Sequence, residues 1–242
     1  MNQLLLLGGT TEGPALAALL DARRLPVVAS LAGVTRHPAP YPVPVRTGGF
    51  GGIPGLIEWL NEHRPPAVID ATHPFASQMQ ANAAAACAAT VIPRVRVLRP
   101  PWPERPRWRH VANLTVAAQA LPPGARVLLT TGHDAAVFRD RTDCRFLLRT
   151  IEPAGPQPPH IAALLDRPPF TIAGETALMR DHEITHLVTK NSGGSGTAKL
   201  RAAEALGVEI LVVDRPTPPP GPVVHTLDDA LVWLDAALRV GN

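Results

Sequence analysis

Short apolar runs alternate with stretches of helix length along most of the chain, and this alternation constrains the fold more than any other feature. Strands that alternate with helices form βαβ units, in which the strands are parallel and helices cover both faces of the sheet. We therefore expect an α/β protein. The strands are expected at residues 4–7, 27–30, 67–71, 91–98, 126–131, 184–190 and 209–214. The longest helices between them are expected at residues 11–24, 75–89 and 197–206.

A proline-rich segment divides the 242-residue chain. Residues 99–107 read RPPWPERPR, and repeated prolines continue neither a helix nor a strand ladder. We interpret this segment as a linker between two doubly wound parallel-sheet domains, residues 1–112 and 113–242, with a cleft between them. A second proline cluster, residues 215–224, leads into an amphipathic helix expected at residues 226–239.

Composition argues against several classes of function. The net charge of +3 is small, and an aromatic content of 4% leaves few side chains for stacking on bases, so we expect no nucleic-acid partner. No apolar stretch approaches the roughly 20 residues of a membrane span, and we expect a cytoplasmic protein without a membrane partner. The nine histidines lack metal-ligand spacing and the two cysteines lie apart, so no metal site is expected.

The first strand runs into the turn GGTTEG, residues 8–13. Helix N-termini at the carboxyl edge of a parallel sheet present free N–H groups to phosphate. The dinucleotide fingerprint requires glycine at its first, third and sixth positions, but Thr10 occupies the third. Gly8, Gly9, Thr10 and Thr11 are therefore candidate cofactor residues, with Thr11 as a helix cap. A plain strand-to-helix turn is the alternative.

The loop after the second strand contains hydroxyl and guanidinium donors but no acid. Residues 23–57 include neither Asp nor Glu, although a site for NADH places an acid near the ribose. Ser30, Thr35 and Arg36 instead match a 2′-phosphate, which favours NADPH. The alternative is that Arg36 is a solvated surface charge.

Two further motifs are expected at the same edge of the sheet. RTGGFGG supplies Gly48, Gly49 and Phe50, whose loop either lets a ligand approach the backbone or is simply flexible. DATHPFA places Thr72 and His73 after the third predicted strand. Asp70 in this motif either belongs to the ligand site or only holds the loop in place.

The second half carries a separate set of strand-end residues. VTKNSGGSGTAKL fails as a phosphate-binding P-loop, because Ala198 precedes Lys199 and Leu200 follows it. A glycine nest after a cationic strand end favours a carboxylate or phosphate ligand, although a simple helix entry is the alternative. Candidate substrate-binding residues are Gly132, His133, Lys190, Asn191, Ser192, Gly193 and Gly194.

Three segments together resemble the precorrin-6A reductase family of cobalamin biosynthesis, which includes the cobalt-precorrin-6A reductases. They are LLLLGGTTEGPALA, DATHPFA and VTKNSGGSGTAKLRAAEALGVEILVVDRP, and the likeness covers nearly the whole chain. The resemblance implies two Rossmann-like domains that bind NADPH and a tetrapyrrole. It also implies reduction of a macrocyclic double bond to give precorrin-6B. The family's motifs fall on residues 8–11, 70–73 and 190–194.

The expected chemistry is hydride transfer from the nicotinamide, with a proton added at the neighbouring carbon. His73 is the candidate catalytic residue, with a structural role as the alternative, and solvent is another possible source of the proton. One rival function is a reductase or epimerase of a smaller substrate, but the Tyr-x-x-x-Lys relay is missing because Val45 occupies the fourth position after Tyr41, the only tyrosine. A second rival is a non-catalytic, dinucleotide-binding redox sensor.

Overall fold

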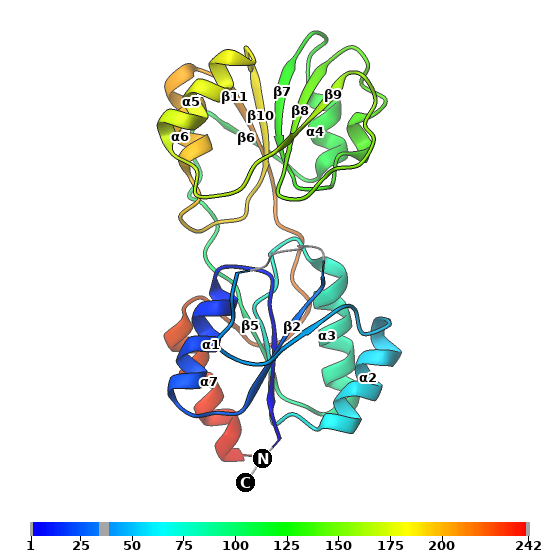
Figure 1. The fold of residues 1–242 in the computed structure, drawn as a ribbon, viewed down its shortest axis with the longest axis vertical. Coiled ribbons are helices and arrows are strands. Elements are labelled where there is room, and N and C mark those ends of the chain that lie inside the picture. Colours follow the sequence, from blue (N-terminus) through cyan, green and yellow to red (C-terminus); the bar gives the residue numbers. More distant parts are fainter. Residues whose placement is uncertain (1, 34–38, 241–242) are drawn as a thin grey trace. The chain divides into compact units, whose positions relative to one another are not determined.

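The protein consists of two compact units, seen in a computed structural model that describes residues 2–33 and 39–240 (Figure 1). The first unit comprises Met1–Pro100 and Pro216–Asn242, and the second comprises Pro101–Arg215. Each unit contains one six-stranded sheet. All strand pairs in both sheets are parallel, which confirms the predicted α/β class.

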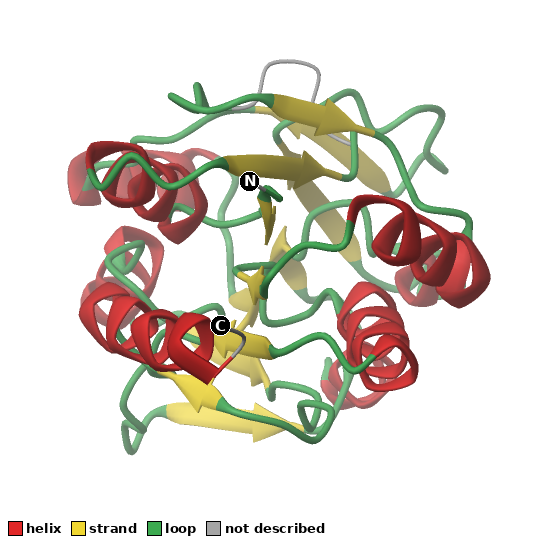
Figure 2. Ribbon diagram, turned by 90° about the horizontal axis from the view of Figure 1, so that it is seen from below, coloured by secondary structure: helices red, strands yellow, loops and turns green. Residues whose placement is uncertain are grey.

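The first sheet has the order β12-β5-β4-β1-β2-β3. Helices α1 and α7 cover one face of this sheet, and α2 and α3 cover the other (Figures 1 and 2). The central strands β1 and β4 bury side chains on both faces, as the uninterrupted run Leu4–Leu7 requires. The elements are β1 (Leu4–Leu7), α1 (Glu12–Ala22), β2 (Val27–Leu31), β3 (Val45–Thr47), α2 (Gly52–His63), β4 (Val68–Asp70), α3 (Ser77–Thr90), β5 (Arg94–Val97), β12 (Val223–Val224) and α7 (Leu227–Val240).

The second sheet has the order β6-β11-β10-β7-β8-β9. Helices α5 and α6 pack on one face, and α4 lies on the other (Figure 1). Leu128, Leu187 and Val212 lie at the centre of its core and are almost fully buried. The elements are β6 (Trp108–Val111), α4 (Leu114–Ala120), β7 (Arg126–Thr130), the short 3-10 helix η1 (Ala136–Phe138), β8 (Arg145–Thr150), β9 (Ile161–Leu165), α5 (Ile172–Asp181), β10 (His186–Lys190), α6 (Ala198–Leu206) and β11 (Glu209–Val213).

Both sheets follow the Rossmann order 3-2-1-4-5-6 when read from the appropriate edge. In the first unit this reading is β3-β2-β1-β4-β5-β12, and in the second it is β9-β8-β7-β10-β11-β6. The order reverses between β1 and β4 and between β7 and β10. Ligands of open parallel sheets bind beyond the strand carboxyl ends at such a reversal, so each unit has one expected binding edge.

The predicted division after residue 112 is wrong, because the sixth strand of each sheet comes from the half of the chain that was assigned to the other domain. β6 precedes residue 112 but pairs with β11 in the second sheet, whereas β12 pairs with β5 in the first. Helix α7 then packs Leu231 and Leu234 into the core of the first unit. The chain therefore passes between the units twice, once within each proline cluster.

The seven strands and four helices expected from sequence are present, with shifts of a few residues at their ends. Five strands were not expected: β3, β6, β8, β9 and β12. In the described part of the chain, no helix is both long and apolar enough to cross a membrane. The cytoplasmic location stays a prediction. Both cysteines are buried free thiols.

Candidate functional site

The glycine turn after β1 meets the loop after β4 at the reversal point of the first sheet. Thr10 Oγ1 donates a hydrogen bond to the Ala71 carbonyl at 2.9 Å. Gly9 has φ +150°, and a Cβ at this position would lie 3.5 Å from the His73 nitrogen. The Gly8 nitrogen donates to the Ser30 carbonyl at 2.9 Å. The structure thus brings together the predicted residues that follow β1, β2 and β4.

Tyr41, which sequence reasoning did not place in the site, explains two of the glycines. A Cβ at Gly8 would lie 2.4 Å from the Tyr41 hydroxyl oxygen, and a Cβ at Gly13 would lie 2.3 Å from it. Any larger residue at either position would collide with the phenol. The first and sixth positions of the fingerprint are therefore occupied by glycine to accommodate this ring. No local pattern in the sequence pairs Tyr41 with the turn.

The predicted cap at Thr11 is not formed. Thr11 has helical backbone angles, φ −65° and ψ −22°, and its side chain makes no capping hydrogen bond, because caps normally require extended backbone. Thr11 Oγ1 instead donates to Glu12 Oε2 at 3.3 Å.

Glu12 places a carboxylate in the first turn of α1, next to the glycine turn, and Arg99 Nη1 forms an ion pair with it at 2.9 Å. Burial alone would raise the pKa of Glu12, but hydrogen bonds from Thr10 and Thr11 and the charge of Arg99 lower it overall. The partner charge of Arg99 reduces the repulsion that this carboxylate would exert on an anion at the helix N-terminus.

Asp70 anchors the loop after β4 through a buried charge cluster. Its Oδ1 accepts hydrogen bonds from the Thr72 nitrogen at 3.1 Å and from Thr72 Oγ1 at 2.7 Å. Its Oδ2 lies 3.7 Å from Arg94 Nη1 and 3.6 Å from Arg96 Nη1, and all three side chains are buried. Asp70 thus ties the loop, which was the alternative considered from sequence.

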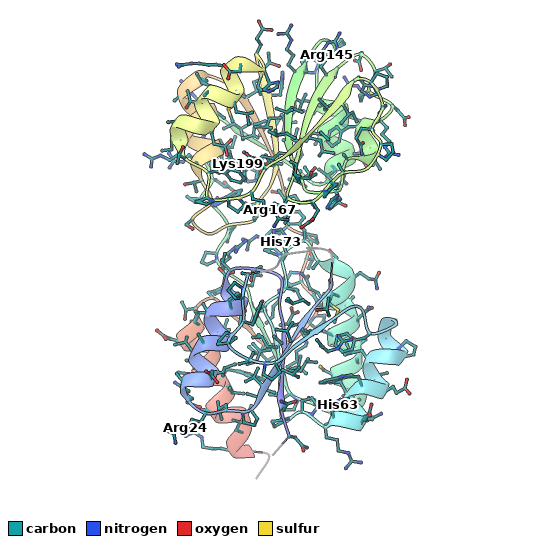
Figure 3. All side chains as sticks on the ribbon, in the orientation of Figure 1. Arg24, His63, His73, Arg145, Arg167 and Lys199 are labelled. Atoms are coloured by element: carbon teal, nitrogen blue, oxygen red, sulfur yellow. The ribbon has the colours of Figure 1, made fainter. Side chains whose placement is uncertain are left out.

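His73 lies at the carboxyl edge of the first sheet (Figure 3). Its Nδ1 accepts a hydrogen bond from the Phe75 nitrogen at 3.2 Å, which places the proton of the neutral ring on Nε2. The Gln80 amide donates to the His73 carbonyl at 2.7 Å. The first contact orients the ring and the second holds the backbone, and the catalytic role of His73 stays a prediction.

Arg46 joins the remaining predicted residues of this edge, although sequence reasoning missed it. Its guanidinium donates to Ser30 Oγ at 2.7 Å and to the carbonyls of Gly48 and Gly49 at 3.1 and 3.2 Å. Its Cζ lies 3.8 Å from the centroid of the Phe50 ring. Among the described residues no carboxylate pairs with Arg46, so neutral oxygens and an aromatic face hold an uncompensated positive charge.

The loop around Arg46 is open to a ligand. A Cβ at Gly48, whose φ is +111°, would meet no heavy atom within 4 Å. Open space beside Gly48 and the hydrogen-bond donors of Arg46 therefore lie together at the ends of β2 and β3. This is the position of the adenosine ribose in Rossmann folds. Thr35 and Arg36, the other predicted residues of this subsite, lie outside the described part of the chain.

The second unit groups its predicted residues at the carboxyl ends of β7 and β10. Lys190 Nζ donates to Asp134 Oδ2, which links the end of β10 to the loop that carries Gly132 and His133. Thr131 Oγ1 donates to the Asp134 carbonyl at 3.0 Å and holds that loop in place. His133 is exposed, and Gly132 has φ +70° with open space around it.

The loop after β10 is fixed to Trp102. Asn191 Oδ1 accepts from the Trp102 nitrogen at 2.9 Å, and the Gly194 carbonyl accepts from Trp102 Nε1 at 2.9 Å. The Asn191 side-chain oxygen is therefore engaged within the protein rather than directed to a ligand. Gly193 and Gly194 have φ values of +67° and +73°, and Ser192 completes this turn. Sequence reasoning did not anticipate the role of Trp102.

Within residues 2–33 and 39–240, no group of three His, Cys, Asp or Glu side chains is arranged to hold a metal ion. The candidate residues of each unit, described separately above, supply backbone amides, hydroxyls and cations at the edge of that unit's own sheet.

Comparison with known proteins agrees with the motifs. The family model described as precorrin-6x reductase CbiJ/CobK matches residues 3–235. A precorrin-6A reductase of Rhodococcus erythropolis is 47% identical over 99% of this chain and 100% of its own length. One of Rhodobacter capsulatus is 44% identical over 97% of this chain and 96% of its own length.

A solved structure of CobK precorrin-6A reductase superposes with a TM-score of 0.91 at 43% identity and covers 98% of this chain and 97% of that one. A match of this extent includes both units and both proline-rich crossings. The chain belongs to the precorrin-6x reductase family.

Proposed function

We propose that this chain reduces a ring double bond of precorrin-6A to give precorrin-6B, with NADPH as the hydride donor. The relatives named precorrin-6A reductase are 39–47% identical to it, whereas those named cobalt-precorrin-6A reductase are 29–30% identical. This difference supports the metal-free macrocycle as substrate.

One observation carries the choice of NADPH: Arg46 is an uncompensated guanidinium at the ends of β2 and β3. The 2′-phosphate is what distinguishes NADPH from NADH, and an arginine near the second strand accommodates it. An acid there would instead accept the ribose hydroxyls of NADH, and residues 23–57 contain none. Ser30, Gly48, Gly49 and Phe50 position Arg46, and Arg36 is proposed as a second phosphate ligand.

The glycine turn is proposed to receive the cofactor pyrophosphate. Gly9, Thr10 and the N-terminus of α1 lie at the β1/β4 reversal, where backbone N–H groups are available to phosphate. Thr72 and His73 border this turn and are proposed to contact the nicotinamide half. Bound NADPH supplies the hydride, while these residues hold it in one orientation and restrict water.

The second unit is proposed to bind the macrocycle. Precorrins carry many carboxylates, and Lys190 together with the N–H groups of the Ser192–Gly194 turn offers donors to them. Gly132 and His133 leave an accessible loop beside Lys190. The acidic partner Asp134 orients Lys190 in the absence of substrate.

A coupled spectroscopic assay tests this proposal. The full chain is mixed with NADPH and precorrin-6A, and the NADPH absorbance and the macrocycle spectrum are followed together. We expect both to change with a stoichiometry of one cofactor per macrocycle. Binding of NADPH without turnover would contradict the proposal and favour a redox sensor, whereas turnover of only a smaller carbonyl substrate would favour the other rival.

A further inference from the structure

Lys199 is a cation at the second sheet edge that the proposed function leaves without a role. It is the second residue of α6, whose N-terminus follows the loop after β10, and Figure 3 shows it in the second unit, away from Arg145 at the opposite edge of the sheet. Its Nζ lies 5.2 Å from the centroid of the Trp102 indole. Within the described chain the ammonium forms no hydrogen bond and no ion pair, so its protons are available to a ligand.

Trp102 connects Lys199 to the proposed substrate loop. Its indole Nε1 donates to the Gly194 carbonyl, and its backbone nitrogen donates to Asn191 Oδ1. An ammonium over this ring therefore lies beside the Asn191–Gly194 turn. Lys199 also keeps part of its surface accessible, as contact with a substrate and re-protonation by solvent require.

Two charged groups act on the ammonium, Arg149 from β8 and Glu175 from α5. They form a buried ion pair of 2.8 Å with each other. Burial, and to a smaller extent the charge of Arg149, lower the pKa of Lys199 to about 8 against the opposing charge of Glu175. An acid with a pKa near the working pH is mainly protonated yet releases its proton readily.

Lysine is rare in this chain, which makes its presence at residue 199 notable for proton transfer. It contains 21 arginines but only two lysines, Lys190 and Lys199. Arginine supplies positive charge everywhere else and does not release a proton at neutral pH. A lysine at residue 199 differs from that background in one chemical respect, which is that its proton can leave.

We propose that Lys199 donates the proton that completes reduction of the macrocyclic double bond. This inference rests on the proposed function. The hydride supplied by NADPH adds to one carbon, and the π electrons of the double bond move to the neighbouring carbon. A new C–H bond forms there as an N–H bond of Lys199 breaks, which leaves a neutral amine. The two electrons gained by the macrocycle are those lost by NADPH, and the amine regains a proton from water.

The decisive experiment compares Lys199→Met with Lys199→Arg at saturating NADPH and precorrin-6A. We expect kcat to fall about 10²- to 10⁴-fold in both variants, the usual contribution of a general acid, with the substrate KM changed only a few-fold. Arginine retains the charge but not the transferable proton. If Lys199→Arg keeps the wild-type kcat, or if Lys199→Met raises only KM, the residue binds the substrate and the proposal is wrong.

The pH profile gives a second kinetic readout. We expect the wild-type kcat to decline above about pH 8 as Lys199 loses its proton. Glu175→Gln removes the charge that raises the pKa of Lys199 and is expected to move this decline to lower pH. An unchanged alkaline limb in Glu175→Gln, with the protein folded, would contradict the assignment.

A third readout needs no turnover. Protein labelled with carbon-13 at the lysine side chains should give two ε-methylene NMR signals, because the chain has two lysines. Lys199→Met assigns one signal and Lys190→Arg the other. We expect the Lys199 signal to titrate near pH 8, and titration near the ordinary value of about 10.4 would overturn the proposed acid. Failure of the wild-type protein to oxidise NADPH, with this titration intact, would instead count against the proposed function.

Discussion

The two units use the same strand order but present different cations at their carboxyl edges. In the first, Arg46 lies over Phe50 at 3.8 Å and donates three hydrogen bonds to neutral oxygens. In the second, Lys199 lies over Trp102 at 5.2 Å without a hydrogen-bond partner in the described chain. Each cation lies against an aromatic ring, and among the described residues neither forms an ion pair with a carboxylate.

The difference between Arg46 and Lys199 shows that two sheets of the same strand order can present cations of different chemistry. A guanidinium keeps its charge at all working pH values and is held rigidly, which suits an anion that must only be bound. An ammonium with a lowered pKa is less constrained and carries a proton that can leave. These properties match the roles proposed above, binding of a permanent charge by Arg46 in the first unit and proton donation by Lys199 in the second.

The largest expected effect concerns the buried charges of the first unit. Asp70→Asn keeps an oxygen for Thr72 but leaves the Arg94 and Arg96 guanidiniums buried without a counter-charge. Loss of one partner from a buried ion pair costs about 3–5 kcal/mol, so we expect the first unit to unfold at markedly lower urea, as followed by hydrogen exchange. The exposed Asp228→Asn serves as the control, and equal stability of the two variants would show that the cluster contributes little.

Arg46→Ala tests the fixed charge that distinguishes the first unit. We expect NADPH binding to weaken by about 1.5–3 kcal/mol, the range for hydrogen bonds to charged groups, with a much smaller effect on NADH. Calorimetric titration of both cofactors measures the difference, with the exposed Arg239→Ala as a control. An equal loss for both cofactors would remove Arg46 from phosphate recognition.

Lys190→Ala addresses the binding role of the second unit. The ion pair with Asp134 is partly exposed, so we expect an effect of about 1 kcal/mol, seen as a several-fold higher KM for the macrocycle with the NADPH KM nearly unchanged. Asp134→Ala should act in the opposite direction, because it frees the ammonium for substrate carboxylates. A larger change in the NADPH KM would assign this loop to the cofactor.

The smallest effect is expected at Glu12, which is partly exposed, unlike the buried Glu175 of the second unit. Because its pKa in the folded protein is lowered, its carboxylate stabilises the fold above the ordinary value of about 4.3. That contribution is lost as the pH falls through the lowered value. Glu12→Gln should therefore be less stable than wild type at pH 7 by at most about 1 kcal/mol. Urea midpoints of the two proteins should converge at the acid end, and a constant gap would point to a non-electrostatic cause.

Much of the first site followed from local sequence. A parallel sheet collects all strand carboxyl ends at one edge, so GGTTEG, Ser30, RTGGFGG and DATHPFA were expected together, and contacts such as Thr10 to Ala71 bear this out. Arg46 was missed because its partner Ser30 belongs to another strand, and only strand register brings the two opposite each other. Thr11 was misjudged as a cap because a residue type does not determine whether its backbone is helical.

The sequence by itself determined the α/β class, the two glycine-rich edges and the first proline-rich crossing, because these depend on spacing within a dozen residues. That the second proline cluster returns the chain to the first unit was not predicted. Only the tertiary structure decided which sheet receives the two-residue strand β12, how Tyr41 occupies the glycine turn, and that Lys199 lies over Trp102. Strand pairing and cation–aromatic contacts join residues that are far apart in the chain. Their energies depend on distance in space, and no local periodicity encodes that distance.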